Sequence, residues 1–247
     1  MRTANPALSD DTFTGFGRVA REEQMSIQGT VNKAVLLLMC VFLTAAWTWS
    51  LFYRTMSPQA VVPLLAIGAI GGLIVALVTV FKQSWAPVTA PIYALLEGLV
   101  IGGVSAVAEA QFPGIVIQAV GLTFGTCLAL LLAYKSGMIR ASENFKLGVV
   151  AATGGIALFY LLSLILGLFG VRISFLYQSG PLGIAFSLFV VVIAALNLVL
   201  DFDFIEQGAG AGAPRYMEWY AAFGLMVTLI WLYLEILRLL MKLRSRD

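Results

Sequence analysis

Residues 182–200 read LGIAFSLFVVVIAALNLVL and contain no charged side chain. An α-helix rises about 1.5 Å per residue, so roughly 20 apolar residues cross the hydrocarbon core of a bilayer, which is about 30 Å thick. Six other segments of the chain are also long and apolar enough to cross. We therefore predict an all-α polytopic membrane protein with seven transmembrane helices, at about 34–52, 61–81, 88–107, 115–133, 147–169, 182–200 and 219–240.

The composition agrees with a membrane protein. Of the 247 residues, 60% are hydrophobic and 11% are charged, against about 25% charged residues in soluble domains. The absence of histidine excludes His-ligated zinc sites and Ser–His or Cys–His nucleophile pairs. A net charge of +2 with scattered basic residues does not indicate nucleic-acid binding. Cys40 and Cys127 lie in separate apolar runs, so we expect buried, unpaired thiols.

Lys and Arg are unevenly shared between the two sides of the predicted spans. The side of the N-terminus holds nine, whereas the opposite loops hold only Arg54 and Arg172. Short basic loops stay in the cytoplasm, which predicts a cytoplasmic N-terminus. Lys242, Arg244 and Arg246 oppose this pattern, so either they are an exception or the last segment does not cross completely. The predicted regions are a flexible cytoplasmic tail at 1–30, a membrane domain at 31–243 and a basic tail at 244–247.

Pairs of glycines four residues apart occur in three of the predicted spans. Small residues at this spacing let helix backbones approach closely in lipid, where packing drives helix association. The pairs predict a compact bundle, and they are Gly68 with Gly72, Gly98 with Gly102, and Gly121 with Gly125.

Ionisable side chains inside the spans are the candidates for function. Such a group near the middle of a membrane helix costs roughly 2.5–3.5 kcal/mol on insertion scales, so it needs a partner, water or a functional role. Glu97 lies near the middle of the third span without an oppositely charged residue in its helix, and we expect it to face the bundle interior. Glu235 in the last span can pair with Arg238 on one helix face. That pair either lines an ion path or is purely structural.

The densest acidic segment is LNLVLDFDFIEQG at 196–208, where the sixth span ends. On a helix, Asp203 and Glu206 share a face and Asp201 lies on a different side. Hard cations such as Ca²⁺ prefer several oxygen ligands. A possible Ca²⁺ site is therefore Asp201, Asp203 and Glu206, and the alternative is an acidic helix end that is merely solvated.

Four segments together resemble the Bax inhibitor / YccA family, and in particular its bacterial branch. They are QGTVNKAVLLL at 28–38, APIYALLEGLVIGG at 90–103, NLVLDFDFI at 197–205 and EWYAAFGLMVTLIWLYLEILRLL at 218–240. The resemblance covers roughly residues 25–243. It implies six helices around a central seventh, a cytoplasmic N-terminus and a location in the bacterial inner membrane.

The resemblance also implies a pH-sensitive calcium leak. In the family, an aspartate at the cytoplasmic end of span six pairs with an aspartate in span seven. The first matches Asp201 or, with a shift of two residues, Asp203. Thr228 stands at the second position, where its hydroxyl could donate a hydrogen bond instead, and Arg238 matches the family arginine.

Our leading hypothesis is a non-enzymatic membrane protein that passes or binds cations, Ca²⁺ first among them. Asp201 and Asp203 form the cytoplasmic gate, Glu97 and Glu235 line the deeper path, and Arg238 sets the pKa of Glu235. The alternative, also implied by the resemblance, is a regulatory protein that modulates a membrane-bound AAA protease through residues 1–30. An intramembrane aspartyl protease needs a second facing aspartate, which the chain lacks.

Overall fold

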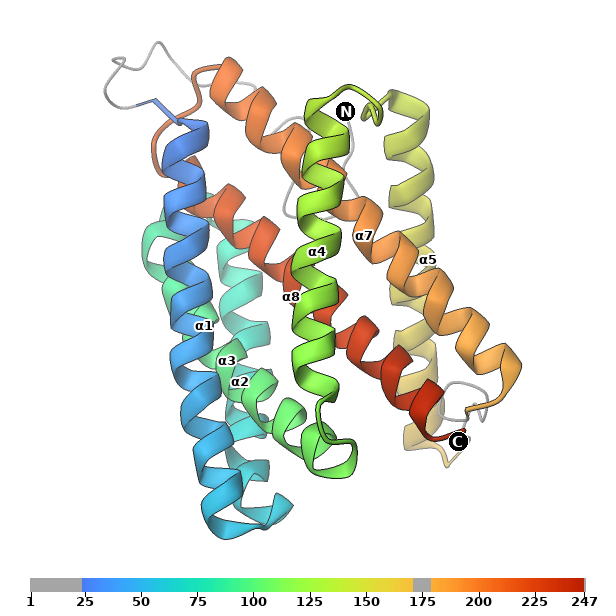
Figure 1. Ribbon diagram of the computed structural model, residues 1–247. Helices are drawn as coiled ribbons and strands as arrows, with labels where there is room; N and C mark the ends of the chain where they lie inside the picture. The colour runs from blue at the N-terminus through green and yellow to red at the C-terminus, as the bar shows by residue number, and fades with distance from the viewer. Residues whose placement is uncertain (1–23, 171–178, 247) are drawn as a thin grey trace. The chain divides into compact units, whose positions relative to one another are not determined.

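Seven long α-helices make up most of the computed structural model, which describes residues 24–170 and 179–246 (Figure 1). All seven are long and apolar enough to cross a membrane. Within the described residues there is no strand, and the prediction of an all-α membrane protein is confirmed. The helices are α1 (Ile27–Thr55), α2 (Pro58–Phe81), α3 (Ala86–Gln111), α4 (Ile115–Lys135), α5 (Glu143–Leu168), α7 (Pro181–Gly210) and α8 (Met217–Arg244), with a 3₁₀ turn, η3 (Gln83–Trp85), before α3.

Two helix ends differ from the prediction in ways that affect the candidate site. Helix α1 begins at Ile27, where the Ser26 side chain caps it by accepting a hydrogen bond from the Gly29 backbone N–H. The last residues of the predicted tail are therefore helical, and residues 1–23 lie outside the described part. Helix α7 continues to Gly210, so the acidic segment that follows residue 200 is helical.

The chain forms two compact units. We call residues 24–113 with 203–227 the first unit, and residues 114–170 and 179–202 with 228–246 the second unit. Helices α7 and α8 are each divided between the two units, with one part of the helix in each unit. The two units are described separately below. The placement of the seventh helix at the centre of the other six stays a prediction.

Close backbone packing characterises the first unit. A Cβ atom added to Gly98 of α3 would collide with the carbonyl oxygen of Val41 in α1, and one added to Gly102 would collide with the backbone of Ala45. Only glycine permits this approach. On α2, a Cβ at Gly68 would lie 2.6 Å from the carbonyl oxygen of Leu96. The predicted role of glycine in helix packing is confirmed for α1, α2 and α3.

Gly121 and Gly125 of α4 behave differently, because within the second unit they meet no neighbouring helix. Apart from the adjoining backbone of α4 itself, no described atom lies within 4 Å of a Cβ built at either position. A spacing of four permits close packing but does not create it, because both helices must also turn the small residues toward each other.

The second unit has an apolar core formed by α5, α7 and α8. Ile156, Val190 and Ile193 are buried there, and Trp231 packs against them. A hydrogen bond of 2.8 Å from Asn197 Nδ2 of α7 to Thr153 Oγ1 of α5 adds a polar contact between helices. Cys40 and Cys127 are unpaired, as predicted, but each is only half-buried.

Candidate functional site

Asp201 is a buried carboxylate in the second unit. It lies on α7, and only 2% of its surface is exposed. Its Oδ2 atom has no hydrogen-bond partner among the described residues. The hydroxyl of Thr228, on α8, lies within hydrogen-bonding range of the Asp201 side chain. The structure therefore brings Asp201, one of the two candidates for the first family aspartate, beside Thr228, which stands at the second position.

The other two acidic residues of this segment do not join Asp201. Asp203 is half-buried and accepts a 2.6 Å hydrogen bond from Gln207 Nε2, and Glu206 is exposed. The described residues contain no group of three His, Cys, Asp or Glu side chains that could hold a metal ion. The predicted Ca²⁺ site at Asp201, Asp203 and Glu206 is thus not assembled. The physical reason is helical geometry, because a step of two residues turns the side chain by about 200°.

Glu97 lies on α3 in the first unit and is half-buried. The Tyr93 side chain, one turn earlier on the same helix, forms a hydrogen bond with it. Its Oε2 atom would lie 3.4 Å from a Cβ atom at Gly72, so the carboxylate points toward α2. Glu97 therefore faces a neighbouring helix inside its unit. Asp201 belongs to the other unit.

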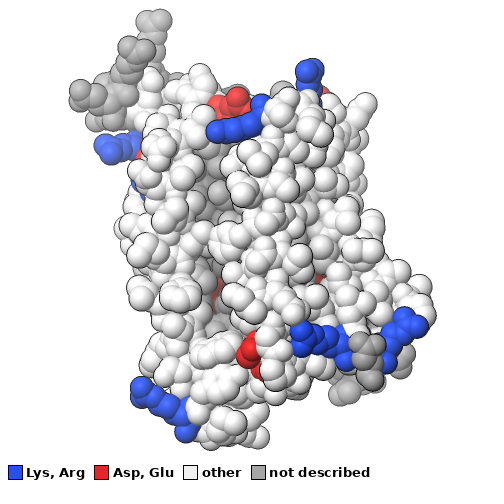
Figure 2. All heavy atoms as spheres, in the orientation of Figure 1, with Lys and Arg blue, Asp and Glu red and all other residues white. Residues whose placement is uncertain are grey.

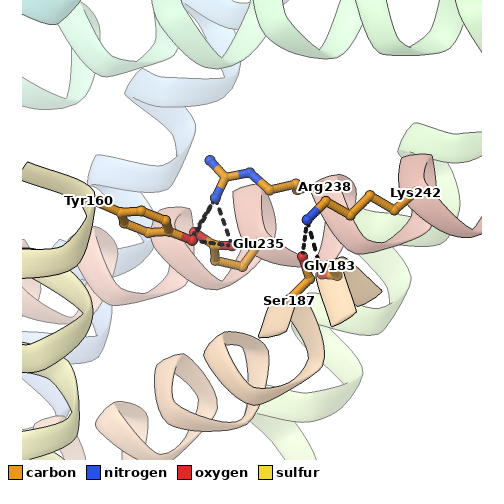
Figure 3. Close-up of polar contacts among 6 residues, drawn as sticks. All are labelled: Tyr160, Gly183, Ser187, Glu235, Arg238 and Lys242. Carbon is orange, nitrogen blue, oxygen red and sulfur yellow. Dashed lines mark hydrogen bonds and ion pairs between the residues drawn. The ribbon is translucent and has the colours of Figure 1, made fainter. Parts of the chain in front are cut away.

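Glu235 and Arg238 pair on one face of α8, as predicted. Arg238 Nη1 lies 3.0 Å from Glu235 Oε1 and 3.1 Å from Oε2. The sequence analysis missed a third member, Tyr160 of α5 (Figure 3). Its hydroxyl accepts a 2.7 Å hydrogen bond from Arg238 and donates to Glu235 at 3.2 Å. The charge of Glu235 is thus matched within α8 and tied to α5.

Lys242 is a buried lysine that the sequence analysis assigned only to the basic end of the chain. Its Nζ atom donates to the Gly183 carbonyl oxygen at 3.0 Å and to Ser187 Oγ at 2.9 Å (Figure 3). Lys242 therefore joins the end of α8 to the beginning of α7. Lys242 follows Arg238 by four residues, and this spacing in the sequence could have predicted that both side chains lie on the same side of the helix.

Glu218 forms a second unexpected cluster, in the first unit. It opens α8, and its side chain is 3% exposed. Its Oε1 atom accepts hydrogen bonds of 2.9 Å from both the backbone N–H and the hydroxyl of Ser26, and its Oε2 atom pairs with Lys33. The carboxylate lies directly against Gly29, where no Cβ atom would fit. We call Glu218, Ser26, Lys33 and Gly29 the α1–α8 clasp.

The fold and the buried charges define a class, that of polytopic membrane proteins with carboxylates inside their spans. Comparison with protein-family models gives a more specific result, because residues 5–245 match the family described as Bax inhibitor 1 like. The chain belongs to this family, and the resemblance stated from the sequence is confirmed. Comparisons with curated proteins and with solved structures gave no match.

Proposed function

We propose that the protein lets cations, Ca²⁺ among them, leak across its membrane, and that Asp201 controls their passage. Membership of the Bax inhibitor 1 like family supports a role in the membrane. The observation that carries the proposal is the Asp201 carboxylate itself, which is buried within a helix that can span the membrane. One of its oxygen atoms has no hydrogen-bond partner in the described part of the chain. Buried charges without a partner in membrane helices characteristically mark ion and proton pathways.

Protonation of Asp201 changes what the site can do. An ionised carboxylate attracts a cation and can replace part of its hydration shell, whereas a protonated one carries no charge. In this proposal the Thr228 hydroxyl, which lies within hydrogen-bonding range of Asp201, donates to the ionised form. Passage of cations therefore follows pH through this one group.

The remaining carboxylates have different roles in the proposal. Among the described residues, Tyr93 is the hydrogen-bond partner of Glu97 and no basic side chain pairs with it, so we retain Glu97 as a cation-binding group. Glu235 is already neutralised by Arg238 and held by Tyr160. Of the two roles considered for Glu235, the contacts support the structural one.

A flux assay in liposomes tests the assignment of Asp201. We expect the Ca²⁺ flux of the unchanged protein to depend on pH, and the flux of Asp201→Asn to lose this dependence. The matched control is Asp203→Asn, two residues away on the same helix, whose carboxylate already binds Gln207. This control retains the pH dependence. Equal flux at every pH for the unchanged protein and Asp201→Asn rejects the proposal.

Two other functions have less support from the contacts of the described residues. Modulation of an AAA protease through residues 1–30 depends mainly on a segment outside the described residues. Deleting residues 1–23 should abolish such an effect and leave ion flux intact. Aspartyl proteolysis would need a second aspartate, and the residue beside Asp201 is Thr228, so we propose no enzymatic activity.

A further inference from the structure

Basic residues gather toward the C-terminal end of α8. Arg238 and Lys242 are spaced by four, which keeps them on one side of the helix, and Arg246 follows two residues after the helix ends at Arg244. Figure 2 shows Lys and Arg side chains gathered around the C-terminal end of α8. Glu235, the acidic partner of Arg238, is buried. This end of the chain therefore presents Arg238, which is partly exposed and paired with Glu235, and the exposed Arg246.

Arg238 is held in one orientation by hydrogen bonds from only one of its terminal nitrogen atoms. All of its hydrogen bonds within the described chain come from Nη1, and its guanidinium lies 5.3 Å from the centre of the Tyr160 ring. The other terminal nitrogen points away from Glu235 and Tyr160 (Figure 3). The side chain is 42% exposed. A fixed guanidinium with one free edge suits a phosphate oxygen.

The length of α8 supports placing these residues near the lipid headgroups. Helix α8 has 28 residues and is longer than the roughly 20 needed for the hydrocarbon core. Its last turns therefore reach the interface, where long basic side chains extend toward lipid phosphates. Ser245 contacts Ser179 before α7, which holds this end of the chain in place.

We propose that the C-terminal end of α8 binds the headgroup of an anionic phospholipid, with Arg238 and Arg246 contacting its phosphate. Lys242 supplies positive charge beneath the site while its Nζ atom stays bound to α7. A phospholipid, rather than a soluble anion, is the occupant because the site lies where a membrane-spanning helix meets the interface.

Lipid titration of the full chain in a neutral detergent tests the proposal. The probe is phosphatidylglycerol, and the readouts are the thermal unfolding midpoint and the number of bound lipids seen by native mass spectrometry. Binding to the folded state raises the midpoint. We expect Arg246→Gln to weaken phosphatidylglycerol binding about fivefold, which corresponds to the loss of one basic residue at a membrane surface. Arg238→Lys keeps the charge but loses the planar group, and it weakens binding as well.

The control variant is Arg54→Gln, which removes an exposed arginine at the end of α1. It should bind phosphatidylglycerol like the unchanged protein. Equal binding by Arg54→Gln, Arg246→Gln and Arg238→Lys overturns the proposal. Equal stabilisation by phosphatidylcholine, or by inorganic phosphate at the same concentration, also overturns it, because the site would then not distinguish an anionic lipid.

Discussion

Asp201 and Glu235 are each 2% exposed, but their surroundings differ. Glu235 has Arg238 and Tyr160 around it, whereas Oδ2 of Asp201 has no hydrogen-bond partner within residues 24–170 and 179–246. A buried carboxylate without a full set of partners costs stability, and a paired one costs far less. A contribution to stability therefore does not explain why a carboxylate occupies position 201.

Replacing each carboxylate by leucine should have opposite effects on the free energy of unfolding. Asp201→Leu removes an unsatisfied buried group and raises stability by about 1–3 kcal/mol. Glu235→Leu leaves Arg238 unpaired and lowers stability by about 1–2 kcal/mol, because the 42% exposed arginine can still reach solvent. Unfolding in mixed detergent micelles measures both. A loss of stability in Asp201→Leu would contradict our reading of the site.

At the scale of helices, α3 and α4 differ in how closely they pack, although both contain a glycine pair spaced by four. Helix α3 makes close backbone contact with a neighbouring helix, and α4 does not within its unit. The sequence predicts both pairs equally well. Only the packed structure shows that Gly98 and Gly102 face α1, whereas Gly121 and Gly125 meet no other helix within the second unit.

Alanine substitutions provide a matched test of this difference. Gly98→Ala and Gly102→Ala should each lower the thermal unfolding midpoint, because the new methyl group collides with the α1 backbone. Gly121→Ala and Gly125→Ala should leave it unchanged or raise it slightly, since alanine favours helix by about 1 kcal/mol over glycine. Equal losses at all four positions would show that the α4 glycines also pack closely.

The α1–α8 clasp joins two helix beginnings that lie far apart in the chain. A carboxylate near a helix N-terminus binds its free N–H groups and interacts favourably with the helix dipole. Glu218 does this for α1 by accepting the Ser26 N–H, although it belongs to α8. The clasp therefore sets the position of α1 within the first unit.

Removing the charge of Glu218 should loosen this contact. Glu218→Gln is expected to lower the free energy of unfolding by about 2 kcal/mol, and to speed hydrogen exchange at the first amides of α1. The control is Glu143→Gln, since Glu143 also lies in the first turn of a helix and pairs with a lysine, Lys146, but is 65% exposed. Equal losses of unfolding free energy in the two variants would show that the clasp stabilises the protein no more than a surface ion pair does.

At the scale of the whole molecule, the odd number of candidate spans bears on the position of the C-terminal end. The basic residues there opposed the charge rule in the sequence analysis. Lys242 proves to be bound to Gly183 and Ser187, so one of these charges serves helix packing. The last helix is also long and apolar enough to cross.

We therefore expect residues 136 and 245, which are separated by three candidate spans, to lie on opposite sides of the membrane. Single cysteines, Ser136→Cys or Ser245→Cys, in a chain with Cys40 and Cys127 replaced by alanine, can be labelled with a membrane-impermeant maleimide. In intact cells only one of the two should react. Labelling of both from the same side would show that α8 does not cross.

The sequence alone was enough to predict seven helices, their approximate limits and the family. The bilayer explains why, because each span must satisfy its own backbone hydrogen bonds and must be apolar over a set length. The ends were less certain. Helix α7 continues for ten residues past the predicted end at residue 200, because Asp and Glu interrupt an apolar run without interrupting a helix.

The contacts of the charged residues were decided by the tertiary structure. The sequence could pair Glu235 with Arg238, since both lie on one helix, and the family match suggested Thr228 beside Asp201. It could not place Tyr160 beside that pair, Lys242 against α7 or Glu218 against Ser26. Such contacts join distant segments, and they depend on how each helix is rotated against its neighbours, which close packing settles only when the helices assemble.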